Sequence, residues 1–251
     1  MDCTVGSEPT KWKMEIPMDN TTYIDTFTDD AGGWGGYDET GEIPIETEDG
    51  AAITRSPWWI DANHAPPGGG YLHLLFVLYT TTAFTYGTSS TEGKVPNRFF
   101  RDGYPTDFRE ATVTAKLRGS LAANGADLTL LAQARLGNRY VNHVLTNQSF
   151  DITPDWSEQT VRLSCNPADW TCLGSRHDLT DIYGYGDIED VLADLNFDIM
   201  FVLFPLDVQP SEHISGNPHR LRPGSEYDVE TDRLPAGHIA LDEVRIDFAS
   251  P

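Results

Sequence analysis

The sequence predicts an all-β fold, an antiparallel β-sandwich of the jelly-roll type with one short helix near residues 187–195. The 22 Gly and 16 Pro among 251 residues are typical of short strands joined by tight loops. Several segments alternate apolar and polar residues with the period of a half-buried strand. The nearly continuous apolar run from Phe197 to Phe204 has the length of a strand buried on both faces, and such a strand needs further sheet beside it.

The expected helix directly precedes that run. Asp187 is a favourable N-cap residue. The apolar residues after it are spaced as one helical stripe, at Ile188, Val191, Leu192 and Leu195. We therefore expect about two helical turns leading into a buried strand that ends at Pro205.

The other strands are expected in chain order at residues 23–27, 43–45 or 51–54, 71–79, 109–119, 127–136, 137–152, 159–163 and 238–249. In 71–79 the alternation assigns one face to Tyr71, His73, Leu75, Val77 and Tyr79 and the core face to Leu72, Leu74, Phe76 and Leu78. The last strand has a possible irregularity near Asp242.

The length fits one large all-β domain. Residues 1–20 are expected to be a polar tail and residues 21–251 a single β-sandwich domain. Long polar loops at 85–107 and 209–237 interrupt it, and function is often placed on such loops.

The charge restricts the possible partners. The 17 basic and 39 acidic residues give a net charge of -22, which argues against nucleic acid and anionic membrane surfaces. A strongly negative surface suits a protein that works at high salt or in calcium-rich surroundings. The alternative is that the charge serves only to keep the protein soluble. No apolar run approaches the roughly 18 residues of a membrane span, so no membrane insertion is expected.

The cysteines bear on the compartment. Cys165 and Cys172 are seven residues apart, and a local disulfide between them would indicate an extracellular protein. The alternative is a pair of buried thiols in a cytoplasmic protein. Cys3 is left unpaired in either case.

The order of sequence elements resembles a known family. The elements are GGW near the start, SPWWIDANHAPPGGGYLHLLFVLY, PDWSEQTVRL, DIEDVLADL before an apolar strand, and the closing HIALDEVRIDFAS. Across residues 23–250 they resemble the laminin IV (laminin B) domain and, more loosely, jelly-roll sandwiches of the galactose-binding and carbohydrate-binding type. The resemblance implies an extracellular interaction domain without catalytic residues. Jelly-roll relatives often hold structural calcium and bind glycans on aromatic platforms, whereas the two long inserts depart from the family.

Loop aromatics are the first candidate ligand site. Sugar rings stack on indole and phenol faces while polar side chains bind their hydroxyl groups. The candidates are Trp34, Tyr37, Trp58 and Trp59. Neighbouring residues of a strand point in opposite directions, so at least one of the adjacent tryptophans is expected to be buried.

A polar sheet face is the second candidate. If the strands adjoin, it would combine Tyr71, His73, Lys116, Arg118, Gln133, Arg135, Tyr140 and Asn142. Such a patch would attract an anionic sugar, with His73 or Tyr71 as a base and Arg118 or Arg135 neutralising its carboxylate. An ordinary solvated face is the alternative.

Acidic residues offer a third candidate, a calcium site formed by Asp25, Asp29, Asp30 and Asp242, whereas the default interpretation is that these acids are simply solvated. The seven histidines lack zinc-motif spacing, and no phosphate loop or GxSxG motif is present, so we expect no organic cofactor. The leading interpretation is a saccharide- or matrix-binding sandwich without catalysis. The alternatives are a lyase or hydrolase acting on an anionic sugar over the polar face, and a purely structural domain.

Overall fold

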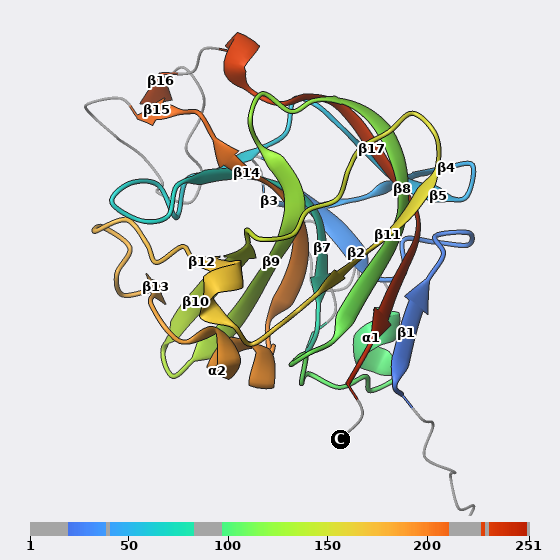
Figure 1. Ribbon diagram of the computed structural model, residues 1–251, viewed down its shortest axis with the longest axis horizontal. Coiled ribbons are helices and arrows are strands. Elements are labelled where there is room, and N and C mark those ends of the chain that lie inside the picture. The colour runs from blue at the N-terminus through green and yellow to red at the C-terminus, as the bar shows by residue number, and fades with distance from the viewer. Residues whose placement is uncertain (1–19, 39–40, 83–96, 211–226, 229–230, 250–251) are drawn as a thin grey trace, which may run out of the picture.

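The computed structural model describes residues 20–38, 41–82, 97–210, 227–228 and 231–249. Two β-sheets pack face to face in this part of the chain (Figure 1), and the strand pairs are antiparallel apart from the short pair β10 and β13. The predicted antiparallel β-sandwich is confirmed. No helix in the described ranges is long and apolar enough to cross a bilayer.

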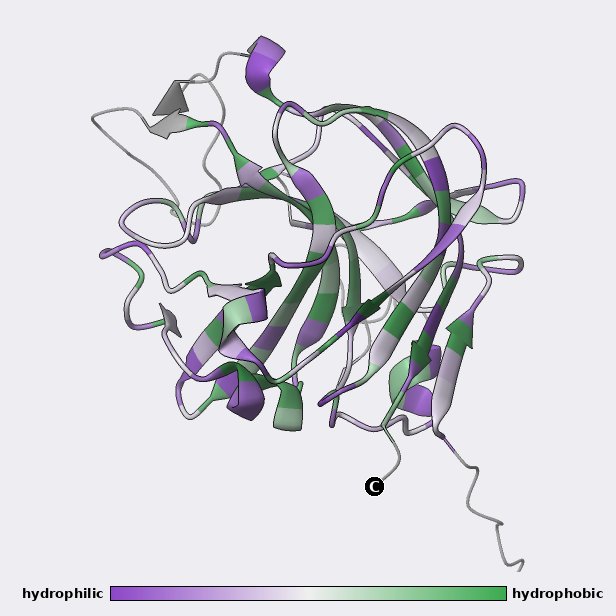
Figure 2. Ribbon diagram, viewed as in Figure 1, coloured by the Kyte–Doolittle hydropathy of each residue, from purple (hydrophilic) through white to green (hydrophobic). Residues whose placement is uncertain are grey.

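The smaller sheet has the strand order β11-β8-β17-β5-β4, with β1 also paired to β17. Its strands are β1 Thr22–Asp25, β4 Glu46–Glu48, β5 Ala51–Arg55, β8 Thr112–Ala122, β11 Ser157–Arg162 and β17 Ala236–Asp247. Figure 2 shows the hydrophobic and hydrophilic residues that alternate along β8, the pattern of a strand with one face in the core.

The larger sheet has the order β12-β10-β9-β14-β7-β2-β3, with β13 beside β10 and β6 beside β7. Its strands are β2 Trp34–Asp38, β3 Gly41–Pro44, β6 Ile60–Asp61, β7 Tyr71–Tyr79, β9 Asp127–Leu136, β10 Arg139–Leu145, β12 Trp170–Cys172, β13 Tyr183–Gly184 and β14 Asp198–Leu206. The remaining elements are β15 Gln209–Pro210, β16 Tyr227–Asp228, α1 Arg98–Arg101, α2 Ile188–Ala193 and 3₁₀ turns at Pro167–Asp169 and Thr231–Arg233.

The helix and the buried strand form as predicted, except that the strand continues through Pro205 to Leu206 instead of ending at the proline. Helix α2 follows the N-cap residue Asp187, whose side chain makes no capping hydrogen bond. Strand β14 lies between β7 and β9 and is buried along its length except at Pro205. The predicted irregularity in the last strand is also present, as a shift in β17 pairing between Leu241 and Glu243.

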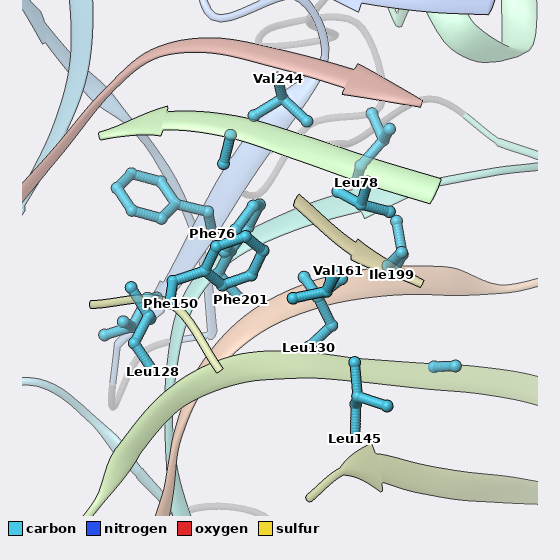
Figure 3. Close-up of a cluster of buried hydrophobic side chains, with 14 of the residues drawn as sticks. Phe76, Leu78, Leu128, Leu130, Leu145, Phe150, Val161, Ile199, Phe201 and Val244 are labelled. Atoms are coloured by element: carbon cyan, nitrogen blue, oxygen red, sulfur yellow. The ribbon is translucent and has the colours of Figure 1, made fainter. Parts of the chain in front are cut away.

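The core fills the space between the sheets. Figure 3 shows Phe76 of β7, Leu130 of β9 and Phe201 of β14 meeting within it, with Val244 of β17 entering from the other sheet. Each is fully buried. Burying a side chain of this size contributes about 1.5–3 kcal/mol relative to leaving it exposed, so the inner faces hold the sandwich together.

Strand β7 departs from regular alternation. Phe201 of β14 pairs with Phe76, whereas the next residue, Val202, pairs with Leu74. Leu75 is therefore an extra residue, and both Leu75 and Phe76 belong to the core. The bulge exchanges the two faces of the strand at its middle.

The predicted faces of β7 are consequently wrong before the bulge and confirmed after it, where Phe76 and Leu78 enter the core. Tyr71 packs in the core, and the ring of His73 lies 5.8 Å from that of the core residue Trp58. Val77 and Tyr79 lie as predicted on the outer face of the larger sheet, in a second apolar cluster, whereas Leu72 and Leu74 join that cluster instead of entering the core. A one-residue slip reverses every side chain on one side of it, which is why the alternation alone misplaces the residues that precede the bulge.

The predicted disulfide does not form, because Cys165 and Cys172 are free thiols. Both are half-buried and pack against the main core, as in the thiol alternative. Cys172 pairs through β12 with His143 of β10, while the backbone N–H of Cys165 donates to Glu110. Cys3 and most of the loops at 85–107 and 209–237 lie outside the described residues.

Candidate functional site

A pocket of about 150 Å³ opens on the outer face of the larger sheet, turned away from the smaller sheet. Strands β2, β7, β9, β10 and β14 supply its base, and the segment around β6 and strand β13 supply its rim. We call it the outer-face pocket.

A polar row runs along the sheet at the outer-face pocket, and its two central members, Gln133 and Asp198, line the pocket. Asn142 of β10 pairs with Gln133 of β9, which pairs with Asp198 of β14, which pairs with Tyr79 of β7. Residues directly paired across neighbouring strands point to the same face. All four side chains are buried, so this sheet register places a row of hydrogen-bonding groups under the pocket.

Aromatic rings stand on both sides of this row. On the β2 side Tyr37 stacks on Trp59, with ring centroids 5.9 Å apart and planes 26° from parallel. On the β10 side the ring of Tyr140 lies 4.7 Å from Phe197 and 5.9 Å from Tyr183. In the sheet order, β9, β14 and β7 separate β10 from β2, so the two aromatic groups frame the polar row.

Asp198 is the most unusual residue of the outer-face pocket. It is fully buried, and neither carboxyl oxygen has a hydrogen-bond partner among the described residues. Burial raises the pKa of this carboxyl well above its usual range, and the nearby charge of Glu42 raises it further. Asp198 therefore keeps its proton to a higher pH than an exposed aspartate.

Two tyrosines connect the pocket to Glu42. The hydroxyl of Tyr79 donates to Glu42 Oε1 at 2.6 Å and lies 2.5 Å from the hydroxyl of Tyr37. Burial raises the pKa of both phenols, with Tyr37, Asp198 and Glu42 adding to the shift at Tyr79. Both hydroxyls therefore stay protonated and positioned beside the pocket.

A buried histidine fixes the opposite end of the row. His64 Nδ1 lies 2.8 Å from the carbonyl oxygen of Gly174 and donates to it, so Nε2 accepts from the amide nitrogen of Asn142 at 2.7 Å. Burial lowers the pKa of His64, which favours this neutral form. Asn142 Oδ1 is then buried without a partner in the described ranges.

The outer-face pocket brings together Tyr37, Trp59, Gln133 and Tyr140, with Asn142 in the same polar row. These five were expected to bind ligand, and that role stays a prediction. The other three candidates lie elsewhere: Trp34 and Trp58 are buried in the core, and Lys116 is in β8 of the smaller sheet. The expectation that one of the adjacent tryptophans is buried is confirmed at Trp58.

The predicted cationic face does not form. Arg118 belongs to the smaller sheet, where it lies 4.5 Å from the ring centroid of Trp156, and Lys116 pairs there with Asp242 at 2.5 Å. Arg135 is exposed near the end of β9 in the other sheet. Strands β8 and β9 are consecutive in sequence but belong to different sheets, so alternation within each strand could not show that their polar faces separate.

Tyr71 and His73, the two proposed bases, are also unsuited to catalysis on a sheet face. Tyr71 packs in the core, and His73 is 1% exposed with Nδ1 3.1 Å from the carbonyl oxygen of Trp59. Burial lowers the pKa of His73 to about 4. The catalytic set of Tyr71, His73, Arg118 and Arg135 is therefore not assembled.

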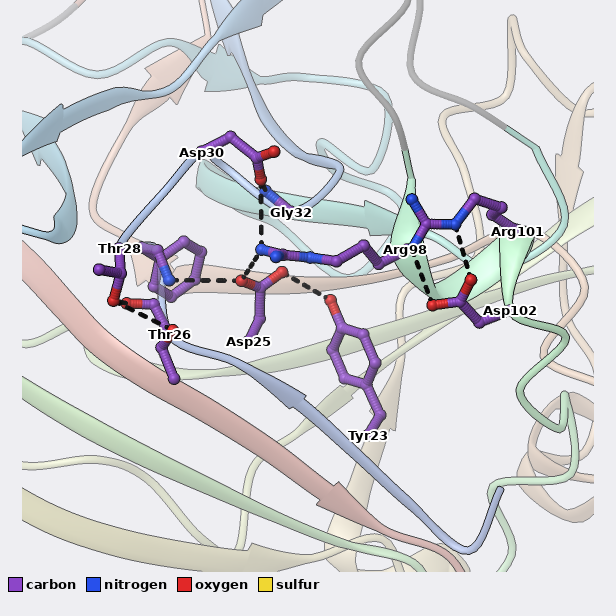
Figure 4. A network of polar contacts seen from close by, with 10 residues as sticks. Tyr23, Asp25, Thr26, Thr28, Asp30, Gly32, Arg98, Arg101 and Asp102 are labelled. Carbon is purple, nitrogen blue, oxygen red and sulfur yellow. Dashed lines mark hydrogen bonds and ion pairs between the residues drawn. The ribbon is translucent and has the colours of Figure 1, made fainter. Parts of the chain in front are cut away.

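An arginine holds part of the predicted calcium set (Figure 4). Arg98 Nη2 lies 2.6 Å from Asp25 Oδ1 and 3.2 Å from Asp30 Oδ1. Asp29 is exposed, and Asp242 is engaged by Lys116. Within the described ranges no three His, Cys, Asp or Glu side chains gather as metal ligands, so calcium stays a prediction without support from these residues.

Five polar or aromatic residues of the outer-face pocket were not predicted from the sequence: Asp61, Asn63, Tyr183, Phe197 and Asp198. Asp198 had a usable signal, because a single acidic residue at the start of an otherwise apolar, doubly buried strand requires an explanation. The others come from loops and short strands whose position depends on tertiary packing.

Comparisons with known proteins add little to this description. No family model matches the sequence, and neither does any curated protein. A solved structure of CtCBM11, a carbohydrate-binding module studied for its dynamics and binding, matches 94% of this chain and 100% of its own, with 10% identity and a TM-score of 0.33. A structure from work on endo-acting O-glycanases of the human gut microbiota that initiate mucin breakdown covers 91% of this chain and 99% of its own, with 12% identity and a TM-score of 0.37. Similarity at this level identifies neither a family nor a ligand, and the laminin IV resemblance stays a prediction.

Proposed function

We propose that this protein binds a saccharide in the outer-face pocket without altering it. The observation that carries the proposal is the pair of aromatic groups, Tyr37 with Trp59 and Tyr140 with Phe197 and Tyr183, on either side of a buried polar row. A sugar ring offers apolar C–H faces to aromatic rings and hydroxyl groups to polar atoms, so this arrangement matches both parts of its surface.

The size of the pocket supports a small bound unit. Its volume of about 150 Å³ lies below the roughly 300–1,000 Å³ of sites that enclose drug-sized ligands. We therefore expect the pocket to hold one sugar residue, with the rest of an oligosaccharide lying outside it. The partner-less carboxyl oxygens of Asp198, which lines the pocket, would gain hydrogen bonds from the hydroxyl groups of that residue.

The test is a thermal-shift screen of neutral, basic and acidic oligosaccharides, with and without calcium, followed by calorimetry on each stabilising ligand. Trp59→Ala and Tyr140→Ala should each weaken binding about two- to tenfold, since stacking on one aromatic ring contributes about 0.5–1.5 kcal/mol. Trp156→Ala, on the smaller sheet, is the matched control and should leave the affinity unchanged.

The ligand should be recovered intact after prolonged incubation, as judged by chromatography. Consumption of the ligand would replace the binding proposal with catalysis. Unchanged affinity in both Trp59→Ala and Tyr140→Ala would show that the saccharide binds elsewhere. Dependence of binding on calcium would revive the expected metal site.

A further inference from the structure

We infer that the sugar residue taken by the outer-face pocket carries a free amine, as in a 2-amino-2-deoxyhexose, and that its ammonium group lies against the carboxyl of Asp198. This inference rests on the proposed saccharide function and narrows its ligand class. It follows from the charge of the pocket, the state of Asp198 and the aromatic rings around it.

The charged side chains at the outer-face pocket are acidic. Asp61 and Asp198 line it, and Glu42 adjoins it through Tyr79. No Lys or Arg is among its described lining residues, and Arg135, on the same strand as Gln133, is exposed and lies outside the lining. A sugar carboxylate would therefore meet like charge with no cation to neutralise it, which disfavours uronic acids.

Asp198 lacks hydrogen-bond donors and a compensating positive charge, and an ammonium group would supply both. A buried carboxyl group with two unpartnered oxygens is costly, because it has lost its water and gained no hydrogen bond. An ammonium group offers three N–H donors and a compensating charge. A neutral hydroxyl group would offer one donor and no charge, so the gain at Asp198 is larger for an amine.

The aromatic groups favour the same ligand. Tyr37 with Trp59, and Tyr140 with Tyr183, bring the faces or edges of electron-rich rings to a small site. Cations are attracted to the faces of such rings by about 0.5–2 kcal/mol, more when they are removed from water. N-acetylation removes the charge and adds bulk to the ligand in a pocket of about 150 Å³.

The first experiment is calorimetry at pH 5 with a β-1,4-linked glucosamine trimer, its N-acetylated counterpart and a glucose trimer. The amine-bearing trimer should bind at least tenfold more tightly than the N-acetylated one, a difference of about 1.4 kcal/mol. In Asp198→Asn this ratio should fall towards one, whereas Asp181→Asn, at an exposed carboxyl group, should preserve it.

If Asp198→Asn fails to fold, a second measurement on the wild-type protein tests whether the ammonium group meets the carboxyl of Asp198. When the ammonium group arrives, the protonated carboxyl of Asp198 becomes a carboxylate and its proton goes to the buffer. Binding enthalpies in buffers of different ionisation enthalpy should therefore show proton release with the glucosamine trimer and none with the glucose trimer. The other groups facing Asp198 are the carboxyl of Glu42 and the phenols of Tyr37, Tyr79 and Tyr183.

The outcomes separate the two proposals. Equal or tighter binding of the N-acetylated or glucose trimer, with Trp59 and Tyr140 still required, would overturn the amine inference and leave the saccharide site standing. Absence of proton release on glucosamine binding would also overturn the inference. If none of the trimers binds at millimolar concentration, and the wider saccharide screen is also negative, both proposals fail.

Discussion

Replacing Asp198 by Asn should stabilise the protein by an amount that grows with pH. The substitution keeps the shape of the side chain and removes its ability to ionise. In the native protein burial raises the pKa of Asp198 well above the ordinary value of 3.8, so the native state holds this proton after the unfolded chain has released it. Ionisation of Asp198 therefore opposes folding as the pH rises.

The magnitude follows from proton linkage. Between the unfolded pKa near 3.8 and the raised native pKa, the unfolded chain binds about one proton fewer than the native protein. The wild-type unfolding free energy then loses about 1.4 kcal/mol per pH unit from this group, and the loss ends above the native pKa. Asp198→Asn removes the loss, so its advantage should be smallest near pH 4 and should grow by about 1.4 kcal/mol per pH unit until the pH reaches the raised native pKa.

The assay is urea denaturation of both proteins at half-unit steps from pH 4 to pH 8. Other buried groups also titrate, including Asp25, whose pKa burial raises, and His64 and His73, whose pKa values burial lowers. These contributions cancel in the difference between variant and wild type. Asp181→Asn controls for surface charge. A difference that is independent of pH, or that shrinks as the pH rises, would refute the account of Asp198.

Arg98→Ala should lower the unfolding free energy by about 3 kcal/mol, because it leaves the buried carboxylate of Asp25 without its cation. Arg101→Ala, which removes an exposed pair from the same helix, should lower the unfolding free energy much less than Arg98→Ala, and equal losses in urea denaturation would contradict the buried pair. His73→Ala should cost about 2 kcal/mol through a lost buried hydrogen bond and a cavity. In the wild type, the NMR titration of His73 should have its midpoint near pH 4, and stability from this group should be lost as the pH falls from about 6.5 through 4; a midpoint near 6.5 would show an exposed ring.

The elements that could be predicted from sequence are those whose pattern is local. The stripe from Ile188 to Leu195 and the apolar run that follows it specify α2 and β14 without reference to the rest of the chain. Strand β8 is also predictable from its own sequence, because Val113 and Leu117 are buried as the alternation requires.

The site could be predicted only in part because it depends on how strands associate. Leu75 forms a bulge in β7 that turns Tyr71 into the core and His73 against the core residue Trp58, and nothing in the alternation marks that extra residue. Arg118 and Gln133 lie in consecutive strands that enter different sheets. The polar row through Asp198 exists only because four strands come into register.

The most direct test of the outer-face pocket is the indole N–H spectrum of the protein, labelled with ¹⁵N and titrated with a saccharide ligand. Each of the six tryptophans gives one indole N–H signal. The variants Trp59→Phe and Trp156→Phe identify the signals of Trp59 and Trp156. The account expects the Trp59 signal to shift progressively to saturation while the Trp156 signal, beside Arg118 on the other sheet, stays in place. A saturated protein in which Trp59 is unchanged and Trp156 moves would contradict it.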